Sequence, residues 1–248
     1  MDFSVDSCGL SDIGLVRTNN EDAFLISKEI NFYALADGMG GHLAGEIASK
    51  LFIQIAENKF KEYFSQQDRS CSEDDILAHL NFLFIEANRS VWDQAQQNHS
   101  YKGMGTTACC CYVSGSKLFY GHVGDSRIYL FRKNLVQLTT DHSLRQELID
   151  KGCLTEESAR RFPYRNVITK AIGKGIDIQP EIDLVPVEQG DLVLLCSDGL
   201  SDSLNDREIE TILKSKKATS ELASDLILAA KSKGGQDNVT VVLVRIPT

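Results

Sequence analysis

The sequence contains little that would place it in a specialised class of protein. Its 248 residues include only four prolines and one tryptophan, with no low-complexity tract, linker or repeat of fixed period. The composition, 42% hydrophobic and 25% charged, is that of an ordinary globular protein. A chain of this length can bury a sizeable core, so we expect residues 1–248 to form a single domain.

Long apolar runs and a disulfide pattern are also absent. No run approaches the roughly 20 apolar residues that span a bilayer, and the acidic N-terminus lacks a signal peptide's basic-then-apolar order. The seven cysteines are odd in number, and Cys109, Cys110 and Cys111 are consecutive. This usage favours reduced, partly buried thiols over a redox or zinc role. We therefore expect a soluble, cytoplasmic protein with no membrane partner.

Basic residues are in the minority. The chain has 26 Lys and Arg against 35 Asp and Glu, a formal net charge of -9. This balance weighs against a nucleic-acid partner, because such proteins usually present a basic face. The excess of acid also leaves carboxylates that can bind cations.

Hydrophobic periodicity predicts two long amphipathic helices in the first half of the chain. One runs from about Gly45 to Phe64, and the other begins near Ser72, where Ser-Glu-Asp-Asp has the character of a capping box. Such a pair would pack antiparallel over one sheet. Shorter helices are predicted to begin at Asp141–Ser143 and Thr155, and further helices near 206–214 and 220–232.

Apolar runs predict the strands. These are 8–16 (with a turn), 23–26, 32–36, 106–113, 117–123, 127–131, 192–196 and 239–246, with hairpin-like turns at 114–116 and 124–126. Strands do not alternate one-for-one with helices, so a parallel doubly wound sheet is disfavoured. The order favours an α+β fold with antiparallel sheets between helix layers.

Three aspartates stand next to buried-looking strands. Asp37-Gly38 follows one apolar run, Asp198-Gly199 follows another, and Asp237-Asn238 precedes the last strand. A single Asp-Gly usually marks a turn, but two such pairs and an Asp-Asn suggest that carboxylates are delivered to one place. Clustered carboxylates repel unless cations neutralise them, and hard oxygen ligands suit Mg²⁺ or Mn²⁺.

Seven segments in sequence order resemble the metal-dependent protein phosphatases of type 2C, in their compact bacterial form. They are RTNNED at 17–22, DGMGGH at 37–42, GMGTT at 103–107, HVGDSR at 122–127, TDHS at 140–143, SDGL at 197–200 and DNVT at 237–240. The resemblance implies a four-layer αββα sandwich, two antiparallel sheets flanked by helix pairs. It also implies hydrolysis of phosphoserine and phosphothreonine in proteins with two or three Mn²⁺ or Mg²⁺ ions.

The resemblance also implies which residues hold the metal ions. Asp37 would bridge two ions and the Gly38 carbonyl would bind the second, while Asp198 and Asp237 would hold the first. Asp22, alone or together with Glu21, would act mostly through bound waters. Asp125 would bind a third ion shared with Asp198.

Arg17 is the predicted ligand of the substrate phosphate, because an arginine fork matches phosphate oxygens. The simpler alternative is a surface salt bridge to Glu21 or Asp22. Animal members of the family carry a histidine after the Asp-Gly, where this chain has Met39. His42, three residues on, is a candidate proton donor, although a role at the helix entry is equally compatible with its position. Metal-bound water is the other candidate donor.

The remaining histidines and the flap have simpler interpretations. His122 and His142 are expected to be structural partners of the turns that they occupy. A helical flap is expected at about 143–170, where Arg160, Arg161 and Arg165 form either a solvated face or a surface for acidic partners.

Three alternatives to a protein phosphatase can be compared with the sequence. A pseudophosphatase that only binds phosphoproteins should have lost a metal ligand, and a two-metal nuclease should be basic; neither mark is present. The sequence does little to distinguish a phosphatase of small phosphoesters from a protein phosphatase. The expected partners are phosphorylated proteins, above all bacterial Ser/Thr kinases and their substrates, and nothing demands more than a monomer.

Overall fold

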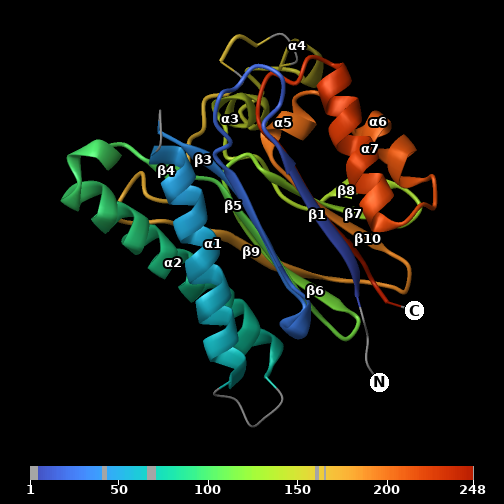
Figure 1. The fold of residues 1–248 in the computed structure, drawn as a ribbon, viewed down its shortest axis with the longest axis horizontal. Coiled ribbons are helices and arrows are strands. Elements are labelled where there is room, and N and C mark those ends of the chain that lie inside the picture. The colour runs from blue at the N-terminus through green and yellow to red at the C-terminus, as the bar shows by residue number, and fades with distance from the viewer. Residues whose placement is uncertain (1–4, 41–43, 66–70, 160–161, 165, 248) are drawn as a thin grey trace.

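The computed structural model describes residues 5–40, 44–65, 71–159, 162–164 and 166–247. Two β-sheets face each other in the centre, α1 and α2 cover the outer face of one sheet, and α6 and α7 cover the other (Figure 1). The predicted four-layer αββα arrangement is confirmed. Within the described residues, no helix has both the length and the apolar character needed to cross a bilayer.

Every strand pair in the two sheets is antiparallel. The first sheet has the order β1 (Asp6–Asp12), β11 (Val239–Arg245), β10 (Leu192–Cys196), β7 (Arg127–Phe131) and β8 (Leu135–Gln137). The second has the order β2 (Asp22–Ser27), β3 (Phe32–Met39), β5 (Ala108–Ser114), β6 (Lys117–Val123) and β9 (Glu181–Pro186), with the short β4 (Gly105–Thr106) beside β3.

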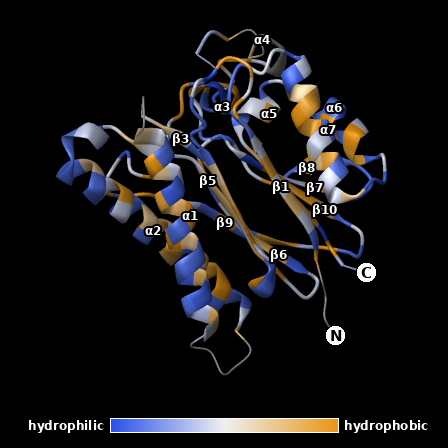
Figure 2. Ribbon diagram, viewed as in Figure 1, coloured by the Kyte–Doolittle hydropathy of each residue, from blue (hydrophilic) through white to orange (hydrophobic). Residues whose placement is uncertain are grey.

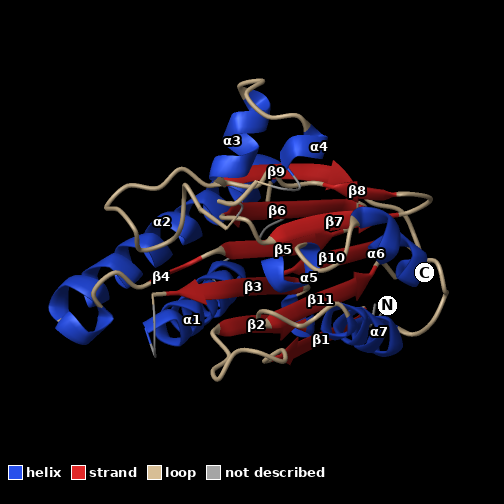
Figure 3. Ribbon diagram, turned by 90° about the horizontal axis from the view of Figure 1, so that it is seen from above, coloured by secondary structure: helices blue, strands red, loops and turns tan. Residues whose placement is uncertain are grey.

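The helices lie outside the sheets and at one end of the sandwich. They are α1 (Ala44–Ser65), α2 (Glu73–Gln97), α3 (Leu144–Asp150), α4 (Glu156–Ala159), α5 (Asp198–Ser201), α6 (Asp206–Leu213) and α7 (Thr219–Ser232), with 3₁₀ turns at Lys28–Ile30 and His99–Tyr101. Figure 3 looks onto the end of the sandwich where α3 and α4 lie. The first two helices pack against each other as predicted.

Three apolar layers hold the sandwich together, one under each helix pair and one between the sheets (Figure 2). The consecutive cysteines of β5 show why both faces of a central strand are apolar. Cys110 packs in the layer under α1 and α2, whereas Cys109 and Cys111 point into the layer between the sheets. All three thiols are buried and free, in agreement with the structural role expected of them.

The turn at residues 124–126 is not the hairpin that the sequence suggested. β6 pairs with β5 and β9 in one sheet, whereas β7 pairs with β10 and β8 in the other. The segment therefore carries the chain from one sheet to the other. The 114–116 turn is the expected hairpin between β5 and β6. Two strands, β8 and β9, were not predicted; neither contains a fully buried residue.

The predicted capping box at the start of α2 is present. The Ser72 hydroxyl accepts from the Asp75 amide at 3.2 Å, and the Asp75 carboxylate accepts from the Ser72 amide at 3.1 Å. Two amides that lack partners within the helix are satisfied in this way.

We expect Ser72→Ala to lower the free energy of unfolding by about 1 kcal/mol, since the cap is lost while no core packing changes. Urea unfolding followed by circular dichroism measures this. Ser224→Ala is the matched control, because Ser224 is an exposed serine within α7 whose hydroxyl donates to the Ser220 carbonyl of its own helix. Equal destabilisation by the two variants would contradict the role of the cap.

Candidate metal and phosphate site

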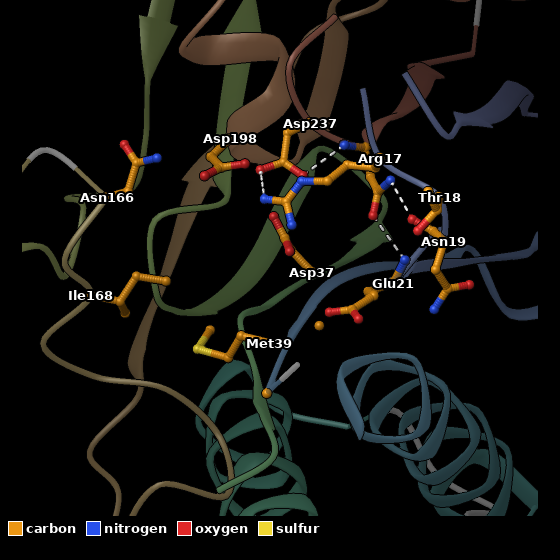
Figure 4. A pocket seen from close by; sticks show the side chains of 13 residues that line it. Arg17, Thr18, Asn19, Glu21, Asp37, Met39, Asn166, Ile168, Asp198 and Asp237 are labelled. Carbon is orange, nitrogen blue, oxygen red and sulfur yellow. Dashed lines mark hydrogen bonds and ion pairs between the residues drawn. The ribbon is translucent and has the colours of Figure 1, made fainter. Parts of the chain in front are cut away.

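The three aspartates singled out in the sequence meet at one end of the sandwich. Asp37 lies near the end of β3 in one sheet, Asp198 begins α5 directly after β10 of the other, and Asp237 stands just before β11. All three line a pocket of about 500 Å³. Their carboxylates gather around the guanidinium of Arg17 (Figure 4). Each sheet therefore contributes to one acidic pocket.

Two glycines allow the segments that carry these aspartates to touch. A Cβ on Gly38 would overlap the carbonyl of Gly45 at the start of α1, and one on Gly199 would overlap the carbonyl of Asn238. The family resemblance implies that the Gly38 carbonyl binds an ion. The structure adds a reason for a glycine at this position, since the backbone around Asp37 could not approach α1 with a larger residue.

The carboxylates repel one another in the absence of cations. Burial raises the pKa of Asp37 well above its usual value, and the charges of Asp22 and Asp198 raise it further. Burial and the charge of Asp125 likewise raise the pKa of Asp198. A buried group of oxygen ligands under this repulsion fits divalent cations, which convert the repulsion into attraction.

Asp22 and Asp125 lie close to this centre without lining the pocket. Asp22 is the direct cross-strand partner of Asp37, and burial raises its pKa to about 6. Burial, followed by the charge of Asp141, raises the pKa of Asp125 to about 7. Each of the two residues has one buried carboxylate oxygen without a hydrogen-bond partner among the described residues. Such oxygens are suited to a water or an ion.

Hydroxyl groups that sequence reasoning did not single out hold Asp22 in place. Its second oxygen accepts from Thr240 at 2.6 Å and from Ser197 at 2.9 Å. Ser197 precedes Asp198, and its hydroxyl also accepts from the Thr240 amide at 3.0 Å. Both residues lie within the quoted motifs, but their partner is about 200 residues away in the chain, so no local pattern reveals the contact.

Thr107 and Asn238 connect the remaining segments. Thr107 accepts from the Asp37 amide at 3.0 Å, and its hydroxyl lies 2.7 Å from that of Ser126, next to Asp125. The Asn238 side chain accepts from the Glu21 amide at 2.8 Å and donates to the carbonyls of Ile13 and Asn19, at 3.0 and 2.9 Å. These bonds fix the acidic segments relative to one another before any ion binds.

Arg17 faces the pocket and pairs with one of its carboxylates. Its guanidinium lies 2.6 Å from Asp237, a partner that the sequence did not indicate. The side chain is still 54% exposed, so a ligand can reach it. The C-terminal part of the predicted flap reaches the pocket through Asn166 and Ile168.

Of the other predicted site residues, Glu21 and Gly38 line the pocket. His42 lies outside the described residues, as do the flap arginines Arg160, Arg161 and Arg165.

Comparison with known proteins identifies this arrangement. The family model described as protein phosphatase 2C matches residues 16–235. The chain belongs to the protein phosphatase 2C family. It is 37% identical over 238 residues to the serine/threonine phosphatase stp of Listeria welshimeri, covering 94% of this chain and 93% of that protein. It is 38% identical over 241 residues to the protein phosphatase PhpP of Streptococcus pneumoniae, covering 95% of each.

Solved structures of bacterial phosphatases share the fold. The serine/threonine phosphatase PstP/Ppp of Mycobacterium tuberculosis has a TM-score of 0.90 at 37% identity, covering 98% of this chain and 99% of that one. A PstP catalytic domain in complex with two manganese ions has a TM-score of 0.86 at 36% identity, again covering 98% and 99%. The predicted family and the predicted enzyme class, a protein-serine/threonine phosphatase, are confirmed.

In this phosphatase, we expect Asp37→Asn to raise the melting temperature in chelator by several degrees, because the isosteric amide removes one buried repulsive charge. With Mn²⁺ present, wild type should have the higher melting temperature, because the bound ion stabilises it more than the variant. Differential scanning calorimetry at pH 8 measures both. Asp183→Asn, on an exposed position of β9, should change neither value. A lower melting temperature for Asp37→Asn in chelator would show that the site is not strained by charge.

Proposed function

We propose that this pocket hydrolyses phosphoserine and phosphothreonine in proteins with two bound Mn²⁺ or Mg²⁺ ions. The observation that carries the proposal is the meeting of Asp37, Asp198 and Asp237 from both sheets around Arg17. The enzyme is a protein phosphatase by family, and its metal dependence agrees with the two manganese ions of the similar PstP structure.

The acidic residues divide into groups by their position. Asp37 stands centrally and is suited to bridge two ions, with the Gly38 carbonyl beside it, while Asp198 and Asp237 come from the opposite sheet to hold the first ion. Glu21 lines the same pocket, and Asp22 supports Asp37 across the strand pair. Asp125 is proposed as the ligand of a third ion with Asp198, supported by their charge interaction and by its unpaired oxygen.

Arg17 is proposed to bind the phosphate of the substrate. In the loaded site Asp237 would share its charge with a cation, which leaves the guanidinium free to donate two hydrogen bonds to phosphate oxygens. When bound, the ions would supply a nucleophilic hydroxide at neutral pH and neutralise charge on the phosphoryl group. Arg17 would hold that group in line for direct displacement of the seryl or threonyl oxygen.

The proton donor for the leaving oxygen stays a prediction. No histidine is present among the described residues that line the pocket, and Met39 occupies the position after the Asp-Gly. His42 and bound water are the two candidates.

The substrates are proposed to be phosphorylated proteins of a bacterial kinase pathway, supported by the named function of the relatives as serine/threonine phosphatases. A pseudophosphatase is disfavoured because Asp37, Asp198 and Asp237 all line this pocket. A role on small phosphoesters is the alternative that an assay must exclude. The monomeric state, the single domain and the cytoplasmic location are further parts of the proposal.

A phosphothreonine peptide should release phosphate with Mn²⁺ and release none in chelator. Asp198→Asn should lower kcat/KM by more than about 100-fold, beyond the loss expected of a residue that merely orients a ligand. Asp183→Asn should retain wild-type turnover, and circular dichroism should show each variant folded. Retained activity in folded Asp198→Asn would mean that the metal centre lies elsewhere. Higher kcat/KM on a small phosphoester than on any phosphopeptide would favour the small-molecule alternative.

Arg17→Lys keeps the positive charge but loses the planar fork, so we expect kcat/KM on the phosphopeptide to fall by about tenfold or more. Steady-state kinetics with Mn²⁺ measures the loss. Arg89→Lys is the matched control, since Arg89 is an exposed arginine of α2 whose side chain is 75% exposed. If both substitutions leave kinetics unchanged, Arg17 contributes only through its charge or through its contact with Asp237.

A further inference from the structure

A second group of side chains of the types that bind metals lies at the β9 edge of the second sheet, outside the carboxylate pocket. His122 on β6 is the direct cross-strand partner of Glu181 on β9, and His142 comes from the segment between β8 and α3. One ligand atom from each residue lies within 4.8 Å of the other two. None of the three lines the proposed phosphatase pocket.

His122 has an unusual environment for a histidine. Its side chain is completely buried; Nδ1 faces the Glu181 carboxylate at the long distance of 3.4 Å, and Nε2 has no hydrogen-bond partner among the described residues. A buried polar group without a partner costs about 1–3 kcal/mol, and such groups are rare in folded proteins. The ring of His142 stacks on that of His122 with centroids 4.8 Å apart and ring planes 19° apart, so one ring has to turn before both can direct an in-plane nitrogen at one ion.

The spacing of His122 and Glu181 is that of two ligands on one ion. Nδ1 of His122 lies 3.4 Å from Oε2 of Glu181. Two ligands at about 2.0–2.1 Å from a tetrahedral zinc ion are separated by about 3.3–3.4 Å. A hydrogen bond fixes the orientation of the Glu181 carboxylate, because its Oε2 also accepts from the Thr140 amide at 3.2 Å. It is 39% exposed, which gives an ion a path from solvent.

We propose that His122, His142 and Glu181 form a second, transition-metal site that binds Zn²⁺ with an open fourth position. Two imidazoles and one carboxylate are a ligand set that zinc favours over magnesium, in contrast to the oxygen-only pocket of the phosphatase centre. The charge states suit this role at neutral pH. Burial lowers the pKa of His142 to about 4, and the neighbouring His122 ring lowers the pKa of Glu181, so the first is neutral and the second ionised.

Binding at this site has a structural consequence at Gly124. The Gly124 amide donates to Nδ1 of His142 at 3.1 Å, which places the ring proton of neutral His142 on Nε2. Coordination by Nδ1 displaces that amide, and coordination by Nε2 moves the proton to Nδ1, where it faces the amide. Either way the Gly124 contact is lost. Gly124 directly precedes Asp125, so its amide reports zinc binding at the turn that leads into the phosphatase centre.

Amide NMR of the ¹⁵N-labelled full chain in excess Mg²⁺, with Zn²⁺ added stepwise, tests the site. We expect the signals of Gly124, Thr140 and Glu181 to shift together at the first additions. In Glu181→Gln the same shifts should need at least tenfold more Zn²⁺. Shifts at Gly38, which report zinc in the phosphatase centre, should be alike in both proteins.

Glu188→Gln is the matched control, because Glu188 is 69% exposed and bonds to Arg132 away from the cluster; it should titrate as wild type. Co²⁺ provides a second readout, since a tetrahedral site with nitrogen ligands absorbs visible light far more strongly than an octahedral oxygen site. The strong band should be present in wild type and absent in Glu181→Gln. The proposal would be overturned if wild type showed neither the strong Co²⁺ band nor the joint shifts of the three amide signals on adding Zn²⁺. Full retention of the band and the shifts in Glu181→Gln would overturn it as well. Phosphopeptide turnover with Mn²⁺ is independent of this outcome.

Discussion

The structure depends on holding mutually repelling carboxylates together. Burial and neighbouring charges raise the pKa values of Asp37 and Asp198, so without cations their approach opposes folding. What offsets this cost is the apolar packing of three layers, one under each helix pair and one between the sheets. A rigid sandwich can therefore carry a strained polar end. The same end becomes favourable when divalent ions supply the missing charge.

Precision at this end comes from backbone contact and from short hydroxyl bonds. Gly38 and Gly199 let the acidic segments approach α1 and Asn238 more closely than any side chain would permit. Asp22, fixed by Ser197 and Thr240, ties the first sheet to the second directly behind Asp37. Because the acidic residues come from both sheets, the packing between the sheets sets their relative positions. Substitutions in the apolar layer between the sheets should therefore change the geometry of the acidic pocket.

The sequence predicts those parts of the structure that leave a local pattern. The long helices, the Ser72 cap, and the Asp-Gly pairs after apolar runs are all visible in short windows. The turn at 124–126 was misassigned because a short Gly-Asp turn looks the same whether the next strand pairs with the last one or joins another sheet. β8 and β9 lack a buried face, so their apolar signal is weak. The partners of Asp22 are long-range and have no local signal.

His122 shows how long-range pairing can also change the interpretation of a residue. The sequence predicts that His122 supports the turn in which it lies. The neighbouring His142 does so, since its Nδ1 accepts from the Gly124 amide. The pairing of β6 with β9, which no local pattern predicted, brings Glu181 opposite His122 and leaves a buried imidazole beside a carboxylate. His122, a nitrogen ligand of the proposed zinc site, and Asp125, a carboxylate of the phosphatase centre, then lie on either side of Gly124 in one short turn. Coupling between two binding sites is reciprocal, so an ion at the histidines that changed the affinity of Asp125 for its ion would have its own affinity changed by the same factor.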